Sequence, residues 1–205
     1  MITASGRSRV SKLIAEKFRL RHISMQCLLN DFIAENPGAD ETLDIKRCAA
    51  EGTRVRDELV NALFGVRMRK HDAKELGACI DGYPKTEGQV NFMKNSLRVE
   101  PNYVFVLECS EDKLTERNRI FDVKTSKKYN LEEAKQTGDY ALAHRVSQAL
   151  EDSSQAFKNR VENWELTKRD ISKGFEGKII TLQIEQQTEE QIVERIEFIV
   201  RKMRL

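Results

Sequence analysis

Two patterns of apolar residues alternate along this 205-residue chain. In some segments apolar residues recur every three or four positions, which is the spacing of one face of a helix. In others, short runs of β-branched and aromatic residues predict strands. The predicted helices span residues 9–18, 28–33, 41–51, 57–71 and 142–173 and a C-terminal segment from 188, and the predicted strands span 21–24, 78–81, 102–108 and 178–184. Strands that alternate with helices predict an α/β domain built on a parallel sheet.

The C-terminal helix has a well-marked predicted start. Thr188 is followed three residues later by Gln191. This is the spacing of a capping box, in which each side chain accepts a hydrogen bond from the other residue's backbone N–H. Apolar residues then follow at helical spacing from Ile192 to Val200, so this helix is predicted to pack one face on the core.

Composition narrows the class of protein. With 35 basic and 33 acidic residues the formal net charge is +2, so charge alone does not point to a nucleic-acid partner. No apolar run approaches the roughly 18–20 residues of a membrane span. The four cysteines form no Cys-x-x-Cys pair and the three histidines have no ligand-like spacing, so neither disulfides nor a resident metal site is predicted. We therefore expect one domain, residues 1–205, in the cytoplasm, with no membrane or nucleic-acid partner.

The segment at residues 77–86 carries the strongest chemical signal, because it reads Gly-Ala-Cys-Ile-Asp-Gly-Tyr-Pro-Lys-Thr. Its short apolar run predicts a buried strand of a parallel sheet. Asp81 ends the run and is predicted to face the crevice where α/β folds bind ligands. Gly82 allows a ligand to approach the backbone closely, and Lys85 can meet a phosphate. A capping role for Asp81 on the next helix is the alternative.

This segment resembles the Asp-Gly-Phe/Tyr-Pro-Arg motif of the adenylate kinase (nucleoside monophosphate kinase) family. The similarity in order and spacing runs from about Gly6 to Leu205. It implies a three-layer α/β fold of the P-loop kinase type, with a parallel sheet, an NMP-binding segment at residues 24–57 and a short lid at residues 119–140. The chain starts at the phosphate loop, so the first strand of that fold is expected to be missing or truncated.

On the donor-nucleotide side, the resemblance implies five contact residues. Gly6 aligns with the last glycine of the family's phosphate loop, Arg7 with its lysine, and Ser8 lies near the metal position. Loops of this kind use glycines so that backbone N–H groups can converge on phosphate. Arg117 matches the residue that stacks on the donor base, and Arg119 is implied to reach the phosphates in catalysis.

On the AMP side, the resemblance implies contacts from four further residues. Val55 belongs to the segment that lines the AMP base, and Gln89 matches the glutamine that reads the adenine edge. Gly82 and Lys85 belong to the motif beside the AMP phosphate. Asp81 matches the carboxylate that organises the water shell of Mg²⁺ near the phosphates.

The sequence departs from the family pattern at positions that bind phosphate. The earlier loop glycines are absent, Arg7 replaces the loop lysine, and Asn30 stands where the family has an arginine for the AMP phosphate. Asparagine does not reproduce a bidentate arginine contact. The family's Arg-x-Asp-Asp run is also missing, and Arg145 and Arg160 are the remaining candidates for its arginines, with an ordinary solvated helix surface as the alternative.

These departures favour a non-catalytic adenylate-kinase-like domain. Such a domain would have protein partners and serve assembly within a larger complex, for example in the axoneme of a cilium or flagellum, where degenerate domains of this family occur. The alternative is an active ATP:AMP phosphotransferase that uses Mg²⁺ with ATP. Binding of adenine nucleotides without turnover lies between these two hypotheses.

Overall fold

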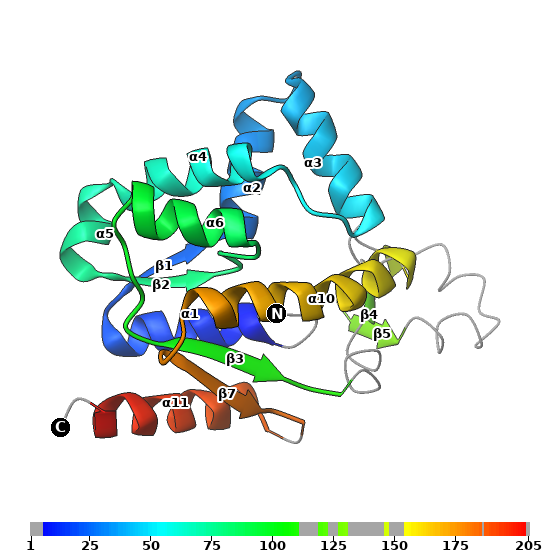
Figure 1. Ribbon diagram of the computed structural model, residues 1–205. Coiled ribbons are helices and arrows are strands. Elements are labelled where there is room, and N and C mark those ends of the chain that lie inside the picture. Colours follow the sequence, from blue (N-terminus) through cyan, green and yellow to red (C-terminus); the bar gives the residue numbers. More distant parts are fainter. Residues whose placement is uncertain are drawn as a thin grey trace.

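The structure of the chain is a computed structural model that contains both helices and strands (Figure 1). The structure describes residues 6–110, 119–122, 127–130, 146–147, 154–185 and 187–203, and within 119–147 the backbone alone. The helices are α1 (Arg7–Phe18), α2 (Met25–Glu35), α3 (Asp40–Glu51), α4 (Asp57–Met68), α5 (His71–Leu76), α6 (Glu87–Asn91), the π-helix η1 (Phe92–Ser96), α10 (Ser154–Gly174) and α11 (Glu189–Met203). The strands are β1 (Arg21–Ser24), β2 (Ala78–Asp81), β3 (Val104–Glu108), β4 (Arg119–Asp122), β5 (Lys127–Asn130), β6 (Val146–Ser147) and β7 (Ile179–Gln183).

The four predicted strands form two parallel pairs, which confirms the predicted α/β fold with parallel strands. β1 pairs with β2, so that Ser24 lies opposite Asp81 at their carboxyl ends. β3 pairs with β7 from Val104 and Ile179 onward. In the part of the chain that the structure describes, no strand joins β2 to β3. The predicted sheet is therefore present as two separate halves.

Side-chain packing places both halves in one layer between two groups of helices. Cys79 of β2 and Phe105 of β3 pack against the same apolar cluster, which is built mainly from α1 and α11. Ala78 and Val104, one residue earlier in each strand, pack against a second cluster that includes α4, α6 and η1. Successive residues of a strand point to opposite faces. The two pairs thus share both faces of a three-layer arrangement.

The predicted helix at residues 57–71 ends early, at Met68, and a second, short helix that was not predicted follows it. α4 ends at Met68 and α5 begins at His71, because Lys70 between them has an extended backbone with ψ of 146°. The helical spacing of apolar residues continues across this break and so could not reveal it.

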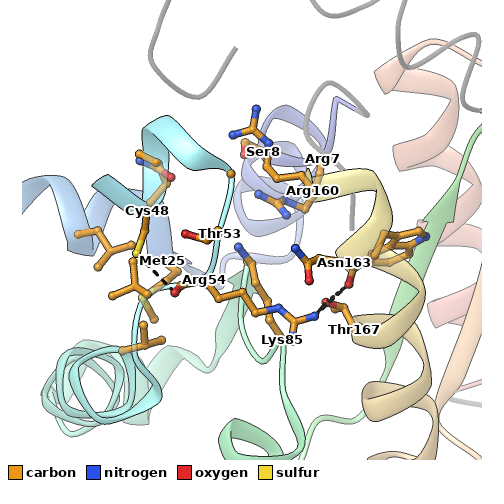
Figure 2. Close-up of a pocket in the computed structure, with 18 of the residues that line it drawn as sticks. Arg7, Ser8, Met25, Cys48, Thr53, Arg54, Lys85, Arg160, Asn163 and Thr167 are labelled. Atoms are coloured by element: carbon orange, nitrogen blue, oxygen red, sulfur yellow. Dashed lines mark hydrogen bonds between the residues drawn. The ribbon is translucent and has the colours of Figure 1, made fainter. Parts of the chain in front are cut away.

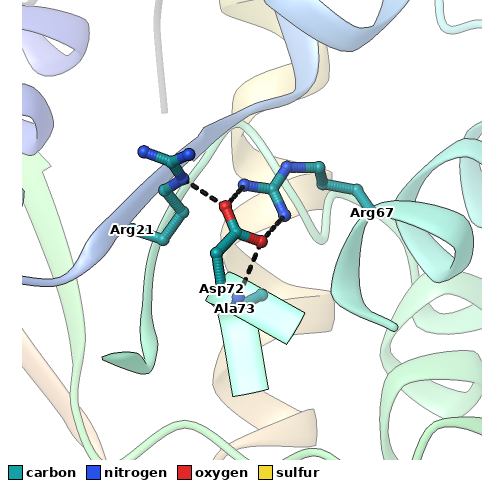
Figure 3. A network of polar contacts seen from close by, with 4 residues as sticks. All are labelled: Arg21, Arg67, Asp72 and Ala73. Atoms are coloured by element: carbon teal, nitrogen blue, oxygen red, sulfur yellow. Dashed lines mark hydrogen bonds and ion pairs between the residues drawn. The ribbon is translucent and has the colours of Figure 1, made fainter. Parts of the chain in front are cut away.

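An ion-pair network holds the corner between α4 and α5, and we call it the Asp72 network. The Asp72 carboxylate accepts hydrogen bonds from both terminal nitrogens of Arg67 at 2.9 Å and from Arg21 Nε at 2.5 Å (Figure 3). The backbone N–H of Ala73 donates to the same carboxylate at 2.8 Å. The hydrogen bond from Arg67 contributes most to lowering the pKa of Asp72 to about 2.

The predicted helix at residues 142–173 is wrong in its first part. Residues 146–147 form strand β6, which pairs with β4, and α10 begins at Ser154. Pairing between strands, which depends on a distant segment, overrides the local helical spacing here. Together β5, β4 and β6 form a small antiparallel sheet in that order. The assignment of residues 119–140 as a lid stays a prediction.

The predicted capping box at the start of α11 is confirmed. The Thr188 backbone N–H donates to Gln191 Oε1 at 2.9 Å, and the Gln191 backbone N–H donates to Thr188 Oγ1 at 3.3 Å. The apolar face that follows is buried, with Ile192 only 1% exposed. Among the helices in the described ranges, none combines the length and apolar character that crossing a membrane requires.

Candidate functional site

A cavity of about 430 Å³ lies at the carboxyl ends of β1 and β2, lined by the residues that follow each strand, Met25 and Gly82. This is the edge where parallel α/β sheets bind ligands. Figure 2 shows the cavity enclosed by the start of α1, by α2 and α3, and by α10. Small-molecule sites commonly have volumes of about 300–1,000 Å³, so a ligand of nucleotide size is compatible with this space.

Positive charge dominates the polar wall of the cavity. Its cations come from α1, the loop after α3, the turn after β2, and α10: Arg7, Arg9, Arg54, Lys85 and Arg160. Among the described residues that line the cavity, none is aspartate or glutamate. The opposite wall, largely from α2 and α3, is apolar: Met25, Leu29, Ile45, Cys48, Val55 and Val60. Such a site suits a ligand with an anionic part and an apolar ring.

The start of α1 adds to this anion-binding character. Gly6, Arg7 and Ser8 line the cavity at the N-terminus of the helix. The Gly6 carbonyl accepts hydrogen bonds from the N–H groups of Arg9 and Val10, both at 3.1 Å, which begins the helix. The first N–H groups of a helix have no partner within it and favour a negative charge. The sequence prediction therefore placed these three residues at a suitable position.

Asp81 forms a buried ion pair with Arg7 at the back of the cavity. The Asp81 side chain is 1% exposed and contacts Arg7 Nε, while the Arg7 side chain is 20% exposed and lines the cavity. The second Asp81 oxygen lies 3.9 Å from His22 Nε2, and the His22 ring is hydrogen-bonded to Ser11 Oγ at 3.0 Å. At Gly82, which has a positive φ of 84°, a Cβ would lie 3.7 Å from the Arg7 guanidinium. That distance is an ordinary contact, so the need for glycine at this position comes from its positive φ.

The residues around Asp81 do not fit the Mg²⁺ ion that the family resemblance implies there. To order the water shell of an ion, a carboxylate oxygen must be accessible from the cavity. Asp81 does not line the cavity, whereas Arg7 does. Within the described residues, no group of three His, Cys, Asp or Glu side chains could hold a metal ion. We therefore assign no chemical step to a metal held by these residues.

Lys85 projects into the same cavity from the turn after β2 (Figure 2). Lys85 is exposed as a whole residue, but protein atoms crowd its ammonium group, and the resulting desolvation, followed by the positive charge of Arg7, lowers the pKa of Lys85 to about 8. The residue nevertheless keeps surface that is accessible through the cavity. An anion can therefore reach Lys85, and it would favour the charged form of the amine.

Gln89 is buried and holds the Lys85 turn in place. Its side-chain oxygen accepts a hydrogen bond from the Lys85 backbone N–H at 2.7 Å, and its side-chain nitrogen donates to Asp57 Oδ1 at 2.7 Å. Thr86 donates to the other Asp57 oxygen at 2.6 Å. Gln89 also lines the cavity. An amide has a second N–H and a second lone pair, so a contact with a ligand remains compatible with this positioning role.

Residues 51–54 join α3 to α10 and close one side of the cavity. Arg54 donates hydrogen bonds from Nη2 to the Asn163 carbonyl and to Thr167 Oγ1, both at 2.9 Å. Gly52 lies so close to α10 that an added Cβ would be 2.1 Å from the backbone oxygen of Ala156. These contacts fix the distance between the apolar wall and the cationic wall.

The contribution of α10 was only partly predicted, because Arg160 was a candidate and the other residues of this helix were not assigned to the site. Arg160, Asn163, Trp164 and Thr167 all line the cavity. Their spacing of three, four and seven residues is that of one helix face, and this was the available signal. Because the helix is strongly polar, its charges were interpreted as a solvated surface, and Trp164 as packing alone.

The predicted site residues fall into three groups. Those that line the cavity together are Gly6, Arg7, Ser8, Val55, Gly82, Lys85 and Gln89. Asp81 lies behind Arg7 and does not line the cavity. Arg119 is in β4, where the backbone alone is described, and Arg117 and Arg145 lie outside the described residues. Asn30, at the position of the family's AMP arginine, is exposed and accepts a hydrogen bond from Gln26 at 3.2 Å. The individual ligand contacts stay predictions.

Comparisons with known proteins point to one family. A family model described as adenylate kinase matches residues 2–198. A chloroplastic adenylate kinase from Zea mays is 30% identical over 182 residues, which cover 88% of this chain and 80% of that protein. The adenylate kinase of Mesomycoplasma hyopneumoniae (strain J) is 30% identical over 198 residues, covering 93% and 91%. The adenylate kinase of Lactobacillus acidophilus is 26% identical over 209 residues, covering 97% and 94%.

Proposed function

Because the chain belongs to the adenylate kinase family, we propose that it binds AMP in the cavity between α3 and α10 and catalyses phosphoryl transfer between ATP and AMP. The observation that supports this most is the division of the cavity into a cationic wall and an apolar wall. The cationic wall suits phosphates, and the apolar wall suits an adenine ring.

In the proposed reaction, a phosphate oxygen of AMP attacks the γ-phosphorus of ATP. A new P–O bond forms, the bond between the γ-phosphorus and the β–γ bridging oxygen breaks, and two molecules of ADP result. Such transfers depend mainly on positioning and on neutralising the charge of the phosphates. Lys85, Arg160 and the N-terminus of α1 are the groups on the cavity wall that can supply this charge. Any Mg²⁺ that ATP carries would be part of the substrate.

A second candidate is the non-catalytic domain that the sequence first suggested. It is favoured by the ion pair of Arg7, because the residue at the position of the loop lysine already has Asp81 as its counter-ion. In that case the chain would serve as a structural part of an assembly with protein partners. A location in the axoneme would be expected only for this non-catalytic domain.

Turnover and binding measurements separate the two candidates. ADP formation from ATP and AMP would be followed in a coupled assay, and binding of AMP, ATP and a dinucleotide pentaphosphate that spans both sites would be measured by calorimetry. We expect turnover, and micromolar or tighter binding of the spanning ligand. Binding without turnover would support the non-catalytic candidate. No heat with any ligand, for a protein shown to be folded, would contradict both nucleotide binding and the kinase activity.

A matched pair of variants tests whether the cavity is the site. Arg160→Gln removes a cation from the cavity wall, and we expect it to weaken AMP binding at least tenfold, which corresponds to about 1.4 kcal/mol. Arg169→Gln removes a 72%-exposed cation of the same helix, whose side chain lies beside Asp170. It should leave AMP binding within about twofold, because exposed pairs contribute little. Equal effects of the two variants would mean that AMP binds elsewhere.

A further inference from the structure

We infer that the Arg7 guanidinium takes the place of a metal ion beside Asp81, so that the cavity binds the phosphates of a metal-free nucleotide anion. The inference rests on the proposed nucleotide binding, and it adds which form of the nucleotide this chain prefers. It also departs from the role that the family resemblance implied for Asp81.

The first argument is the geometry of the carboxylate. Asp81 is the carboxylate at the carboxyl end of β2, where an acidic group could order a hydrated cation, but its side chain is 1% exposed. Arg7 contacts one of its oxygens from the side of the cavity. The guanidinium is a fixed, permanently charged cation. It neutralises Asp81 without a metal and occupies the side from which an ion would approach.

The second argument is the other oxygen of the same carboxylate. It faces His22 Nε2 at 3.9 Å, on the side of β1 rather than of the cavity. The His22 ring is in turn hydrogen-bonded to Ser11 of α1 at 3.0 Å. At 3.9 Å this is no hydrogen bond, and the second oxygen is buried without a hydrogen-bond partner among the described residues, but it faces His22 and not the cavity.

The third argument is the charge of the cavity wall. Five cations line it and no described lining residue is acidic. A divalent cation that entered with the nucleotide would be repelled by these groups, whereas an unchelated phosphate chain would be attracted. The lowered pKa of Lys85 has the same origin in part, since Arg7, Arg54 and Arg160 all contribute to it after burial. Excess positive charge thus favours the more negative, metal-free form of a nucleotide.

The test compares ATP binding with and without Mg²⁺ on the full chain. Trp164 is the one tryptophan of the sequence and lines the cavity, so its fluorescence can report binding alongside calorimetry. Titrations with ATP would be run in EDTA and in excess Mg²⁺ at equal ionic strength. We expect Mg²⁺ to weaken binding by about threefold or more, because chelation removes negative charge from the phosphates. Tighter binding with Mg²⁺ would overturn the inference.

Variants of the ion pair make the test specific. In Arg7→Gln the Asp81 carboxylate loses its guanidinium, and we expect Mg²⁺ to stop weakening ATP binding or to tighten it. The double variant Arg7→Gln/Asp81→Asn removes both charges and should lose this gain. The double variant leaves no buried charge unpaired, so it should fold even if Arg7→Gln does not. Its Mg²⁺ effect can then be compared directly with that of the wild type. Folding of each variant would be checked by circular dichroism.

Arg9→Gln is the control for the loss of positive charge alone. Arg9 lines the cavity, but its partner is the exposed Glu190 at 3.3 Å rather than Asp81. It should reduce ATP affinity without changing the sign of the Mg²⁺ effect. If Arg9→Gln reverses that sign as Arg7→Gln does, the special role of Arg7 is overturned.

The outcomes also separate this inference from the proposed function. ATP binding that requires Mg²⁺ would overturn the inference and leave nucleotide binding in place. Absence of ATP and AMP binding in both buffers would contradict the proposed function, and the inference with it. Tighter binding in EDTA, with a Mg²⁺ effect that changes sign in Arg7→Gln, supports both, whereas equal binding in the two buffers overturns the inference.

Discussion

Two aspartates of this molecule are held by arginine, in regions that differ in their access to water. Asp72 lies at a surface corner, where its side chain is 30% exposed and the Arg21 side chain is 53% exposed. Asp81 lies behind the cavity, where its side chain is 1% exposed. At the corner, Arg67 is 14% exposed, but water reaches the Asp72 carboxylate and can replace Arg21, so the network shapes the backbone but determines little else. Behind the cavity, water cannot replace Arg7 as the partner of Asp81. This ion pair therefore determines the net charge at the back of the cavity.

The largest effect expected from this difference concerns Arg7→Gln. This variant leaves the buried Asp81 carboxylate without its counter-ion, and uncompensated buried charges cost about 3–5 kcal/mol. We therefore expect the free energy of unfolding, measured with urea, to fall by about that amount. Asp81→Asn should cost less, because the Arg7 side chain lines the cavity and can be hydrated there. Equal losses in the two variants would mean that Arg7 and Asp81 do not differ in their access to water.

A smaller loss is expected from Arg54→Ala, which removes the two hydrogen bonds that join residues 51–54 to α10. Hydrogen bonds from charged donors contribute about 1.5–3 kcal/mol, so stability and AMP affinity should both decrease. Arg56→Ala is the matched control, since Arg56 is 62% exposed and pairs with Asp44 at 3.4 Å. We expect it to change the unfolding midpoint in urea little. A large loss of stability in Arg56→Ala would contradict the expectation that arginines at the cavity contribute more than exposed ones.

The next smaller effect concerns the pH dependence of AMP binding, which tests the charge of Lys85 in the cavity. Lys85 has a pKa of about 8 in the free protein, and a bound phosphate would raise this pKa because it stabilises the ammonium form. Affinity should therefore be constant below about pH 7 and decrease as pH rises further, by about twofold at pH 8 and about tenfold at pH 9. Calorimetry in buffers of different ionisation enthalpy would detect the accompanying proton uptake. In Lys85→Met this pH dependence should disappear.

The smallest effect is expected at the Asp72 network. The pKa of Asp72 is lowered to about 2 from an ordinary value of 3.8. Its contribution to stability is therefore complete above pH 3.8 and is lost as pH falls through 2. Near neutral pH, Asp72→Asn should shift the thermal midpoint only slightly, and added salt should reduce the difference further. A shift as large as that of Arg7→Gln would contradict the distinction between the two aspartates.

Local sequence patterns predicted most of the elements but not the contacts between distant ones. Residues 21–24 and 78–81 were predicted as strands from their short apolar runs, and both are strands in the structure. The break at Lys70 and the strand at residues 146–147 were not predicted. Both depend on backbone conformation or pairing that the spacing of apolar residues does not encode.

The same limit applies to the site. The motif at residues 81–85 and the start of α1 could be assigned to the cavity, because strand ends and helix N-termini have predictable positions in α/β folds. The pairing of Arg7 with Asp81 joins residues far apart in the sequence, and nothing local predicts that they neutralise each other. Arg160 was only one of two candidates and Trp164 was not assigned to the site for a related reason, since a polar helix face looks alike whether it borders solvent or a cavity.

The division of the parallel strands into two pairs has a consequence for local opening of the protein. Backbone hydrogen bonds hold β1 to β2 and β3 to β7, whereas the two pairs are united by the side chains of the helices that cover them. Such a junction separates regions that can open independently in the native state. Cys79 of β2 faces the cluster shared by both pairs, and burial raises its thiol pKa to about 12. Its rate of modification by a thiol reagent should therefore measure how often the two halves of the core separate.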